Sequence, residues 1–400
     1  MLNAESIRSR DDLNLFNSLL KDPDVIRVNE AIERMEKKGP AGTRRRLLST
    51  SVRLSPQMAP AVHAVKDECV EKLGIDIPLE LYVYNSPQFN AACVKPEEGR
   101  LFIMFSSSLL EAFKDSELCF VMGHELGHHL YRHHDIPIGY LLKGGARPSH
   151  KLALQLFAWS RYAEISADRA GAHCASDLQG VARSLFRLAS GLSDEVVNFN
   201  LDDFLAQVDD MQQEDAEPGR NAPREDWFST HPFSPMRVKA LKLFDDSEFK
   251  RAHGISVDDL EMGVRGLMGL MEPSYLEGRT RHAEIMRRLL FAGSVAVMQA
   301  NDDIDESEVA RFEQFFGTGA LAKRLDFAKI MDDLPDRIQQ ARENTSISQR
   351  MQVLRDLCVM AVAEGKAQNE EREVVVSIAE ALNISPVFID TQLDAERELD

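Results

Sequence analysis

The residues His124-Glu125-Leu126-Gly127-His128 have the types and the spacing that hydrolytic chemistry requires. Side chains four positions apart share one face of a helix, so the two imidazoles could bind a single Zn²⁺ ion. Glu125 would then face the open coordination position, where a water molecule binds. Zinc polarises both this water and a scissile carbonyl, and Glu125 could take the proton of the water and pass it to the leaving amine. The pattern predicts one zinc ion per chain.

The stretch around these residues must be helical if the two histidines are to share a face. No proline follows until Pro137, and apolar residues recur at helical spacing. The alternative is a helix with solvated histidines, because His129, His133 and His134 lie close by. The apolar positions of the predicted helix are Leu118, Val121, Met122, Leu126 and Leu130.

A site of this kind needs a third ligand, and the predicted helix 148–176 offers one. Glu164 and Asp168 are four apart, so they share a face of that helix. If the helix packs against the first one, Glu164 can bind the zinc. Asp168 can then accept a hydrogen bond from the outer nitrogen of a zinc-bound histidine and fix its tautomer. His150 and His173 are the alternative ligands.

Strand patterns precede the predicted zinc helix. The stretches 79–84 and 100–105 alternate and are rich in aromatic and β-branched residues, and 89–94 between them is also strand-like. Together they predict a small antiparallel sheet. An edge strand of this sheet could pair with an extended peptide and align it across the metal, although plain core strands have the same pattern.

His231 precedes Pro232 and is therefore held in extended backbone. It could reach the metal as a transient fourth ligand, or donate a hydrogen bond to the oxyanion of a tetrahedral intermediate. A turn histidine without any role is the third interpretation. Before it, residues 201–226 are acidic and rich in turn formers, which predicts a surface loop.

Composition narrows the class of protein. The formal net charge of −18 argues against non-specific nucleic-acid binding and against a basic membrane-docking face. No run of about 18 apolar residues exists that would predict a membrane-spanning helix. The five cysteines are scattered and form no CxxC pair, which favours a reducing compartment. We expect a cytoplasmic protein.

Four motifs occur in a fixed order between Leu79 and Leu243. This region resembles the HtpX / CAAX-prenyl-protease family of gluzincin zinc metallopeptidases, although many members of that family have membrane-spanning helices and this sequence has none. The motifs are the strand with Asn90-Ala91, HELGH at 124–128, Glu164-Ile165-Ser166-Ala167-Asp168, and Thr230-His231-Pro232 with Arg237.

The resemblance implies a zinc endopeptidase that acts on protein or peptide substrates. It implies a histidine near the metal at His231, which takes part in catalysis or blocks the site, and a cleft arginine at Arg237. It also implies that the strand with Asn90 and Ala91 binds substrate. The remaining implied roles are zinc ligands for His124, His128 and Glu164, general base for Glu125, and support of a ligand for Asp168.

The C-terminal part has an all-helical pattern with two similar stretches, 296–312 and 360–379. Each has an apolar helix end, a short acidic or glycine-containing turn and a second helix. They resemble the tellurite-resistance TerB-like domain, which implies contact with a divalent ion at these turns. The turns depart from the Asp-Gly form of that family, being Asp302-Asp303 and Glu364-Gly365, so acidic residues that complement helix dipoles are the alternative.

The sequence thus predicts an α+β fold, with a helix-rich zincin-like core, a small mostly antiparallel sheet and an all-α domain. The predicted parts are an N-terminal helical extension (1–50), a peptidase domain (51–250), a linker (251–275) and a TerB-like domain (276–400). The C-terminal domain could bind a protein partner or a divalent ion. Three functions compete: a zinc endopeptidase, a scaffold that keeps the fold with little turnover, and a structural zinc site. The last conflicts with the poised carboxylate of Glu125.

Overall fold

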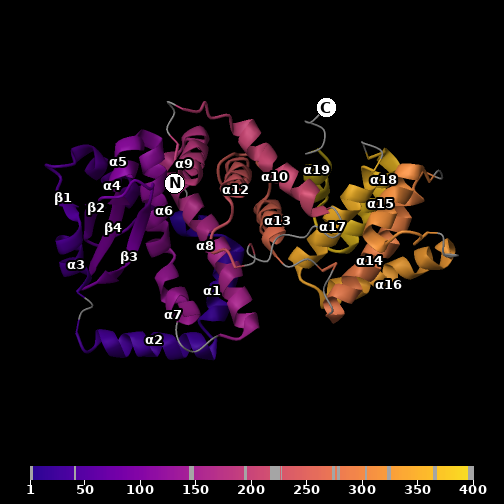
Figure 1. The fold of residues 1–400 in the computed structure, drawn as a ribbon, viewed down its shortest axis with the longest axis horizontal. Helices are drawn as coiled ribbons and strands as arrows, with labels where there is room; N and C mark the ends of the chain where they lie inside the picture. Colours follow the sequence, from indigo (N-terminus) through magenta and orange to yellow (C-terminus); the bar gives the residue numbers. More distant parts are fainter. Residues whose placement is uncertain are drawn as a thin grey trace. The chain divides into compact units, whose positions relative to one another are not determined.

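The computed structural model divides into two compact units. Unit 1 comprises Met1–Leu205 and Phe228–Ile255, and unit 2 comprises Ala206–Trp227 and Ser256–Asp400 (Figure 1). The structure describes residues 3–39, 42–143, 148–192, 196–216, 226, 228–272, 275–276, 280–301, 304–321, 326–363 and 367–394.

Unit 1 combines helices with one sheet. The elements before the sheet and within it are η1 (Ala4–Ile7), α1 (Arg10–Leu19), α2 (Pro23–Glu36), α3 (Thr43–Thr50), β1 (Val52–Leu54), α4 (Pro60–Leu73), β2 (Leu79–Tyr84), β3 (Ala91–Glu97) and β4 (Arg100–Ser106). After the sheet follow α5 (Ser107–Ala112), α6 (Asp115–Leu130), η2 (His133–Asp135), α7 (Ile138–Lys143), α8 (His150–Ala175), α9 (Leu178–Ser190) and α12 (Ser234–Asp245). Helix α10 (Leu201–Ala216) begins in unit 1, and its residues from Ala206 onward belong to unit 2.

The sheet has four strands in the order β1-β2-β4-β3. The pairs β1–β2 and β3–β4 are antiparallel, so the sheet is mostly antiparallel as predicted, whereas β2 and β4 are parallel. A tight hairpin, in which Glu98 and Gly99 both have positive φ, connects β3 to β4. Because β4 rather than β3 pairs with β2, the two paired strands run in the same direction and β3 lies at an edge of the sheet.

Helices α6 and α8 pack against each other along the centre of unit 1. Small residues allow the close approach. A Cβ atom at Gly127 of α6 would lie 2.9 Å from Ala170 Cβ, and one at Gly171 of α8 would lie 2.6 Å from the carbonyl oxygen of Phe120. Real Cβ contacts this short are essentially absent, so glycine is required where these two helices cross.

The N-terminal helices pack against the central helices of unit 1. Phe16 of α1 and Val25 near the start of α2 are buried in one cluster with Ile136, Leu156 and Trp159. The helical prediction for residues 1–50 is correct. The segment shares a hydrophobic core with α7 and α8, which are its partners in that cluster.

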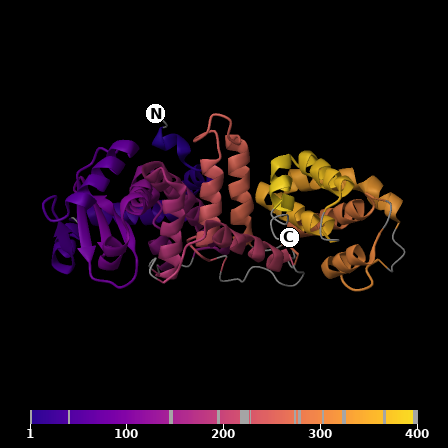
Figure 2. The same ribbon diagram turned by 90° about the horizontal axis from the view of Figure 1, so that it is seen from above.

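Unit 2 is a helical bundle, coloured orange to yellow in Figure 2. Its core gathers around α14 and α17, where Leu289, Leu290, Leu354 and Leu357 are fully buried. Its elements after α10 are α13 (Val257–Met268), η3 (Gly269–Met271), α14 (Arg281–Met298), α15 (Glu306–Phe316), α16 (Phe327–Asn344), α17 (Ile347–Ala361), α18 (Asn369–Ala381) and α19 (Pro386–Asp394).

Two local predictions were wrong. The predicted loop 201–226 opens with α10, whose Phe204 and Val208 are four apart and buried. The predicted linker 251–275 contains α13.

The glycines of the predicted linker lie within or beside a helix. Ser256 accepts a hydrogen bond from the Asp259 amide and so caps α13, while Leu260 and Val264 bury one face of the helix. Among the described helices of either unit, none has the length and apolar character needed to cross a membrane.

Candidate metal centre

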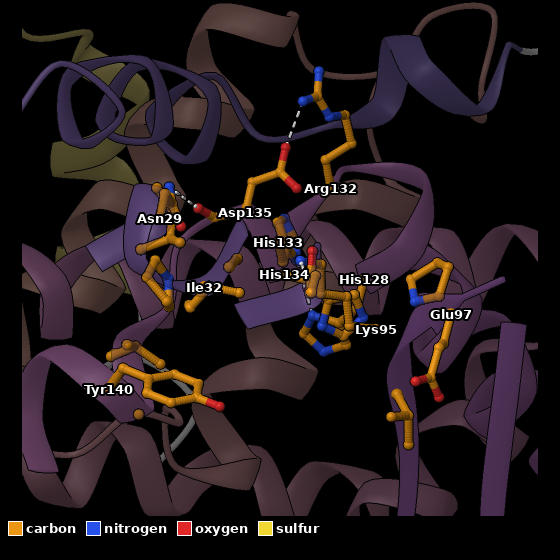
Figure 3. A pocket seen from close by; sticks show the side chains of 18 of the residues that line it. Asn29, Ile32, Lys95, Glu97, His128, Arg132, His133, His134, Asp135 and Tyr140 are labelled. Atoms are coloured by element: carbon orange, nitrogen blue, oxygen red, sulfur yellow. Dashed lines mark hydrogen bonds and ion pairs between the residues drawn. The ribbon is translucent and has the colours of Figure 1, made fainter. Parts of the chain in front are cut away.

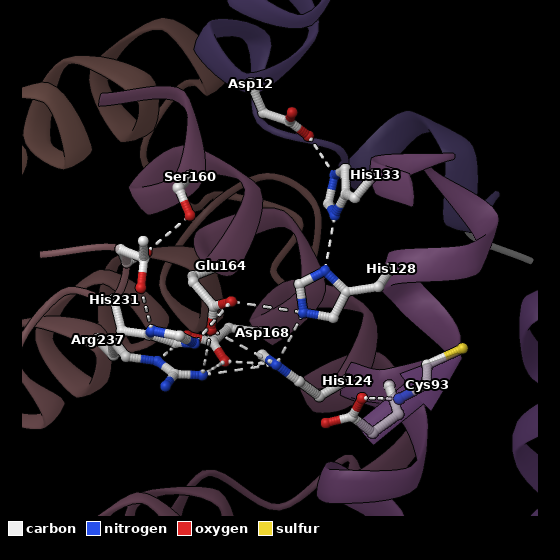
Figure 4. Close-up of polar contacts among 12 residues, drawn as sticks. Asp12, Cys93, His124, His128, His133, Ser160, Glu164, Asp168, His231 and Arg237 are labelled. Atoms are coloured by element: carbon white, nitrogen blue, oxygen red, sulfur yellow. Dashed lines mark hydrogen bonds and ion pairs between the residues drawn. The ribbon is translucent and has the colours of Figure 1, made fainter. Parts of the chain in front are cut away.

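Three predicted ligand side chains meet where α6 packs against α8 (Figure 4). The Nε2 atoms of His124 and His128 lie 3.2 Å apart. Glu164 Oε2 is 3.6 Å from His124 Nε2, and its Oε1 is 3.5 Å from His128 Nε2. The ligand atoms of these residues all lie within 4.8 Å of one another, which leaves room for one ion between them.

The three side chains fit a zinc ion chemically. Two imidazole nitrogens and one carboxylate oxygen form a ligand set that catalytic zinc commonly has. Glu164 Oε2 is buried and has no hydrogen-bond donor among the described residues, as expected of an atom that binds a cation. Burial lowers the pKa of His128 well below its usual value, so this imidazole is neutral and able to bind a metal.

Asp168 and Arg237 lie on the Nδ1 side of the His124 ring. The Asp168 carboxylate lies 2.9 Å from His124 Nδ1 and accepts hydrogen bonds from Arg237 Nε at 2.8 Å and from its Nη2 at 2.5 Å. All three side chains are buried. Burial alone raises the pKa of Asp168, but the Arg237 charge and its hydrogen bonds bring the net value below the usual one. Asp168 is therefore an ionised acceptor that orients the His124 ring.

Arg237 also lies beside the third ligand. Its Nη2 atom is 3.4 Å from Glu164 Oε2. Burial alone raises the pKa of Glu164, yet the charges of Arg237 and His124 lower it overall, so the carboxylate stays ionised. Arg237 thus lies behind the ligands, nine-tenths buried, and contacts both carboxylates of α8.

His128 has its own chain of contacts, which sequence reasoning missed. His128 Nδ1 lies 2.8 Å from His133 Nδ1, and His133 Nε2 lies 3.0 Å from Asp12 Oδ2. Asp12 is fully buried on α1, far from the motif in sequence. Its only signal in the sequence is an acidic residue in the first turn of a helix, which is common for other reasons.

Glu125 contacts the edge strand β3. Its Oε2 atom accepts a hydrogen bond of 2.7 Å from the Cys93 amide of β3. Burial raises the pKa of Glu125 above its usual value, which makes this carboxylate a better proton acceptor in catalysis than a solvated one.

A cavity of about 1080 Å³ opens beside the ligands and includes His128 and Glu164 in its wall. Figure 3 shows Asn29 and Ile32 of α2 on one side and Lys95 of β3 on the other. The Asn29 amide donates to the carbonyl of Asp135, and Lys95 forms an ion pair of 2.8 Å with Glu36 at the end of α2. Helix α2 is therefore tied to both walls of the cavity.

The remaining predicted site residues lie around this centre. His231 Nε2 is 3.4 Å from Glu164 Oε1, and its side chain is 63% exposed. Ala91 begins β3, the edge strand. The main chain of Asn90 is used inside the sheet, where its amide donates to Ser106 Oγ and its carbonyl accepts from the Ser106 amide.

The alternative ligands play no part in the cluster that the described side chains form. His173 lies near the end of α8, outside the group of His124, His128 and Glu164. The side chain of His150 lies outside the part of the chain that the structure describes.

In unit 2 the acidic residues near the two similar turns cap helices. The Glu308 side chain accepts from the Asp305 amide at 3.0 Å, and the Glu371 side chain accepts from the Gln368 amide at 2.7 Å. Both close capping boxes, at α15 and α18. The turns themselves, Asp302-Asp303 and Glu364-Gly365, lie outside the described residues.

Comparison with known proteins agrees with the two resemblances. Residues 56–144 and 141–244 match the family described as Peptidase family M48, and residues 287–391 match Tellurite resistance protein TerB. All three candidate ligands, Glu125, Asp168 and Arg237 lie within the peptidase match, whereas Asp12 lies outside it.

The chain is also similar to the Plastoglobule-localized metallopeptidase 48, chloroplastic, of Arabidopsis thaliana. The two are 31% identical over 218 residues, which cover 51% of this chain and 62% of that relative. The similarity thus spans somewhat less than two thirds of the relative's length.

Proposed function

We propose that the chain is a zinc-dependent metalloendopeptidase, because it matches peptidase family M48 and, after that region, the TerB family. One observation carries the proposal. The ligand atoms of His124, His128 and Glu164 converge within 4.8 Å, and Glu125 stands on the same helix as the two histidines. A bound zinc ion would polarise a water molecule and the scissile carbonyl.

The protein's own groups supply the proton transfers. Glu125 takes the proton from the attacking water, helped by the pKa that burial has raised, and passes it to the leaving amine. The Cys93 amide holds one carboxylate oxygen and leaves the other for the water. Asp168 and Arg237 act as positioning residues, because they touch the ligands rather than the cavity.

An extended peptide is the substrate that suits this site. Strand β3 is an edge strand and its Cys93 amide faces Glu125, so its outer side faces the metal centre. A substrate strand that pairs with β3 from Ala91 onward would have its scissile bond beside Glu125. Only an unfolded or flexible segment can adopt this conformation.

A zinc-binding scaffold with little turnover is the second candidate. The short distance between His231 and Glu164 supports it, because an imidazole at this place could take the fourth position on zinc and exclude the water. The exposure of His231 instead favours a group that withdraws when a substrate enters, or that stabilises the oxyanion.

Unit 2 could regulate the peptidase through a protein partner or a divalent ion. For the turns of the TerB-like repeats we favour a capping role, since Glu308 and Glu371 already accept main-chain hydrogen bonds there. All five cysteines are free thiols, which supports a reducing compartment such as the cytoplasm as the place of action.

Hydrolysis of casein, together with zinc analysis, tests the proposal. We expect wild-type protein to bind one zinc ion and to cleave casein. Glu125→Gln should keep the zinc and lose at least about 100-fold in rate, while Glu111→Gln, on the exposed face of α5, should match the wild type.

The same assay separates the two candidates. If wild type and Glu125→Gln are equally inert while His231→Ala gains activity, the protein is a self-blocked peptidase. If all variants are inert on many unfolded substrates although zinc is bound, the scaffold is the correct function. Without zinc in the wild type, both candidates fail.

A further inference from the structure

Asp12 is a fully buried carboxylate with several hydrogen-bond donors around it. Arg8 Nε donates to it at 2.7 Å, Ser166 Oγ at 2.7 Å and Trp159 Nε1 at 3.0 Å. The contacts from Ser166 and Trp159 dock α1 against α8, whereas the contact from Arg8 lies within the N-terminal segment. The fourth partner is His133 Nε2 at 3.0 Å, and this contact connects α1 to the metal centre (Figure 4).

The hydrogen-bond directions follow from the partners. An ionised carboxylate can only accept, so His133 Nε2 must carry a proton and donate it to Asp12. A neutral His133 then has an unprotonated Nδ1, which accepts from His128 Nδ1 at 2.8 Å. With its proton on Nδ1, a neutral His128 has a free electron pair on Nε2, the atom that faces His124 and Glu164.

We propose that Asp12, acting through His133, is a positioning residue for the metal ligand His128. This inference rests on the proposed zinc centre. Asp168 performs the same task for His124 by direct contact. Each histidine ligand thus has a buried carboxylate that fixes its tautomer and its ring orientation, one directly and one through a second imidazole. Groups of this kind are worth about 10-fold to 100-fold in metal affinity.

An anchoring role of Asp12 does not explain why the imidazole of His133 lies between Asp12 and the ligand His128. The N-terminal segment is also held by a contact that does not pass through His133 or His128, in which the Tyr131 hydroxyl donates to the Ala4 carbonyl at 2.7 Å. Docking alone would not require an imidazole between Asp12 and the ligand. Only the role in positioning His128 requires a donor on one side of the ring and an acceptor on the other.

Asp12→Asn separates the two roles because asparagine has nearly the same shape. Its side chain is neutral in either orientation of the amide, so His133 Nε2 loses the charged acceptor that fixes the tautomers of His133 and His128. Tyr131→Phe is the matched control, since it removes a contact that docks the same segment but leaves Asp12 and His133 unchanged.

The experiment measures the zinc dissociation constant of the full chain by competition with a fluorescent chelator, and the visible spectrum of the cobalt-substituted protein. We expect Asp12→Asn to raise the dissociation constant about 10-fold to 100-fold and to shift the cobalt spectrum. Tyr131→Phe should lower the unfolding temperature of the zinc-free protein without either effect. Should Asp12→Asn fail to fold, His133→Leu replaces it, with the same expected loss of affinity.

Wild-type affinity and an unchanged cobalt spectrum in a folded Asp12→Asn or His133→Leu protein would overturn the proposal. An equal loss in Tyr131→Phe would also overturn it, because docking would then account for the effect. The readout is metal affinity rather than hydrolysis. A protein that binds zinc tightly and cleaves nothing therefore refutes the endopeptidase and leaves this inference standing, whereas a wild type that binds no zinc refutes both.

Discussion

Gly127→Ala should weaken the metal centre more than it weakens the fold. A Cβ atom at this position would lie 2.9 Å from Ala170 Cβ and 3.1 Å from Ala167 Cα. Since carbon atoms pack at about 3.5 Å or more, α6 and α8 would have to separate by about 0.6 Å at this point. His128 follows Gly127 directly, so the ligand atoms on the two helices would move apart with them.

We expect Gly127→Ala to change the stability of the fold little and the affinity for zinc strongly. Overpacking costs about 1–3 kcal/mol, but alanine in place of glycine returns about 1 kcal/mol of helix propensity. The net loss of stability is then about 0–2 kcal/mol, or a few degrees in unfolding temperature for a unit of this size. Sites of this kind tolerate errors of only about 0.5 Å, so we expect the zinc dissociation constant to rise at least about tenfold.

Chelator competition and thermal unfolding of the zinc-free protein measure the two effects separately. Gly139→Ala is the matched control, because Gly139 lies in α7 and a Cβ atom added there would meet no atom within 4 Å. It should leave the affinity unchanged. The double variant Gly127→Ala with Ala170→Gly removes the shortest contact and should restore part of the affinity. Wild-type affinity in Gly127→Ala alone would refute the idea that close helix packing sets the ligand geometry.

Three further predictions follow from other parts of unit 1. Burial lowers the pKa of His134 from 6.5 to about 4. Between these values the side chain is protonated in the unfolded chain but neutral in the folded protein. The free energy of unfolding should therefore fall by about 1.5 kcal/mol between pH 6.5 and 5. Urea unfolding of His134→Gln should lack this loss, and equal pH slopes would contradict it. Zinc at about 1,000 times its dissociation constant should stabilise the wild type by about 4 kcal/mol over the chelated protein, and a similar gain in His128→Ala would contradict the ligand assignment. Ile32→Trp should narrow the cavity and lower casein cleavage about tenfold with zinc content unchanged, whereas full activity would place the substrate elsewhere.

The parts of the site that depend on one helix could be predicted from the sequence. The spacing of His124 and His128 places both rings on one face of any helix, and the same holds for Glu164 and Asp168. That the two helices meet there was an expectation drawn from apolar neighbours and from the family resemblance, and the structure brings the four residues together.

Asp12 could not be predicted, because 121 positions separate it from His133 and no local period connects the two. The pairing of the strands could not be predicted for the same reason. The sequence of β2 and β4 predicts strands, but no local pattern shows that β4 rather than β3 pairs with β2, which makes the two parallel neighbours. Helices α10 and α13 were not predicted because their acidic residues and glycines indicated a loop or a linker. Each helix nevertheless has apolar residues four positions apart that form a buried face.

The close contact of Arg237 with the other groups has a consequence for synthesis of the protein. Asp168 and Arg237 are 69 positions apart, so a ribosome that adds 5–20 residues per second needs roughly 3–14 s to pass from one to the other. During this interval Asp168 and Glu164 lack the cation that keeps them ionised in the interior. We expect nascent chains stalled before Arg237 to retain zinc poorly, and chains stalled after it has emerged to retain it well. A growing chain of this kind could not cut its neighbours on the polysome before its own peptidase domain is finished.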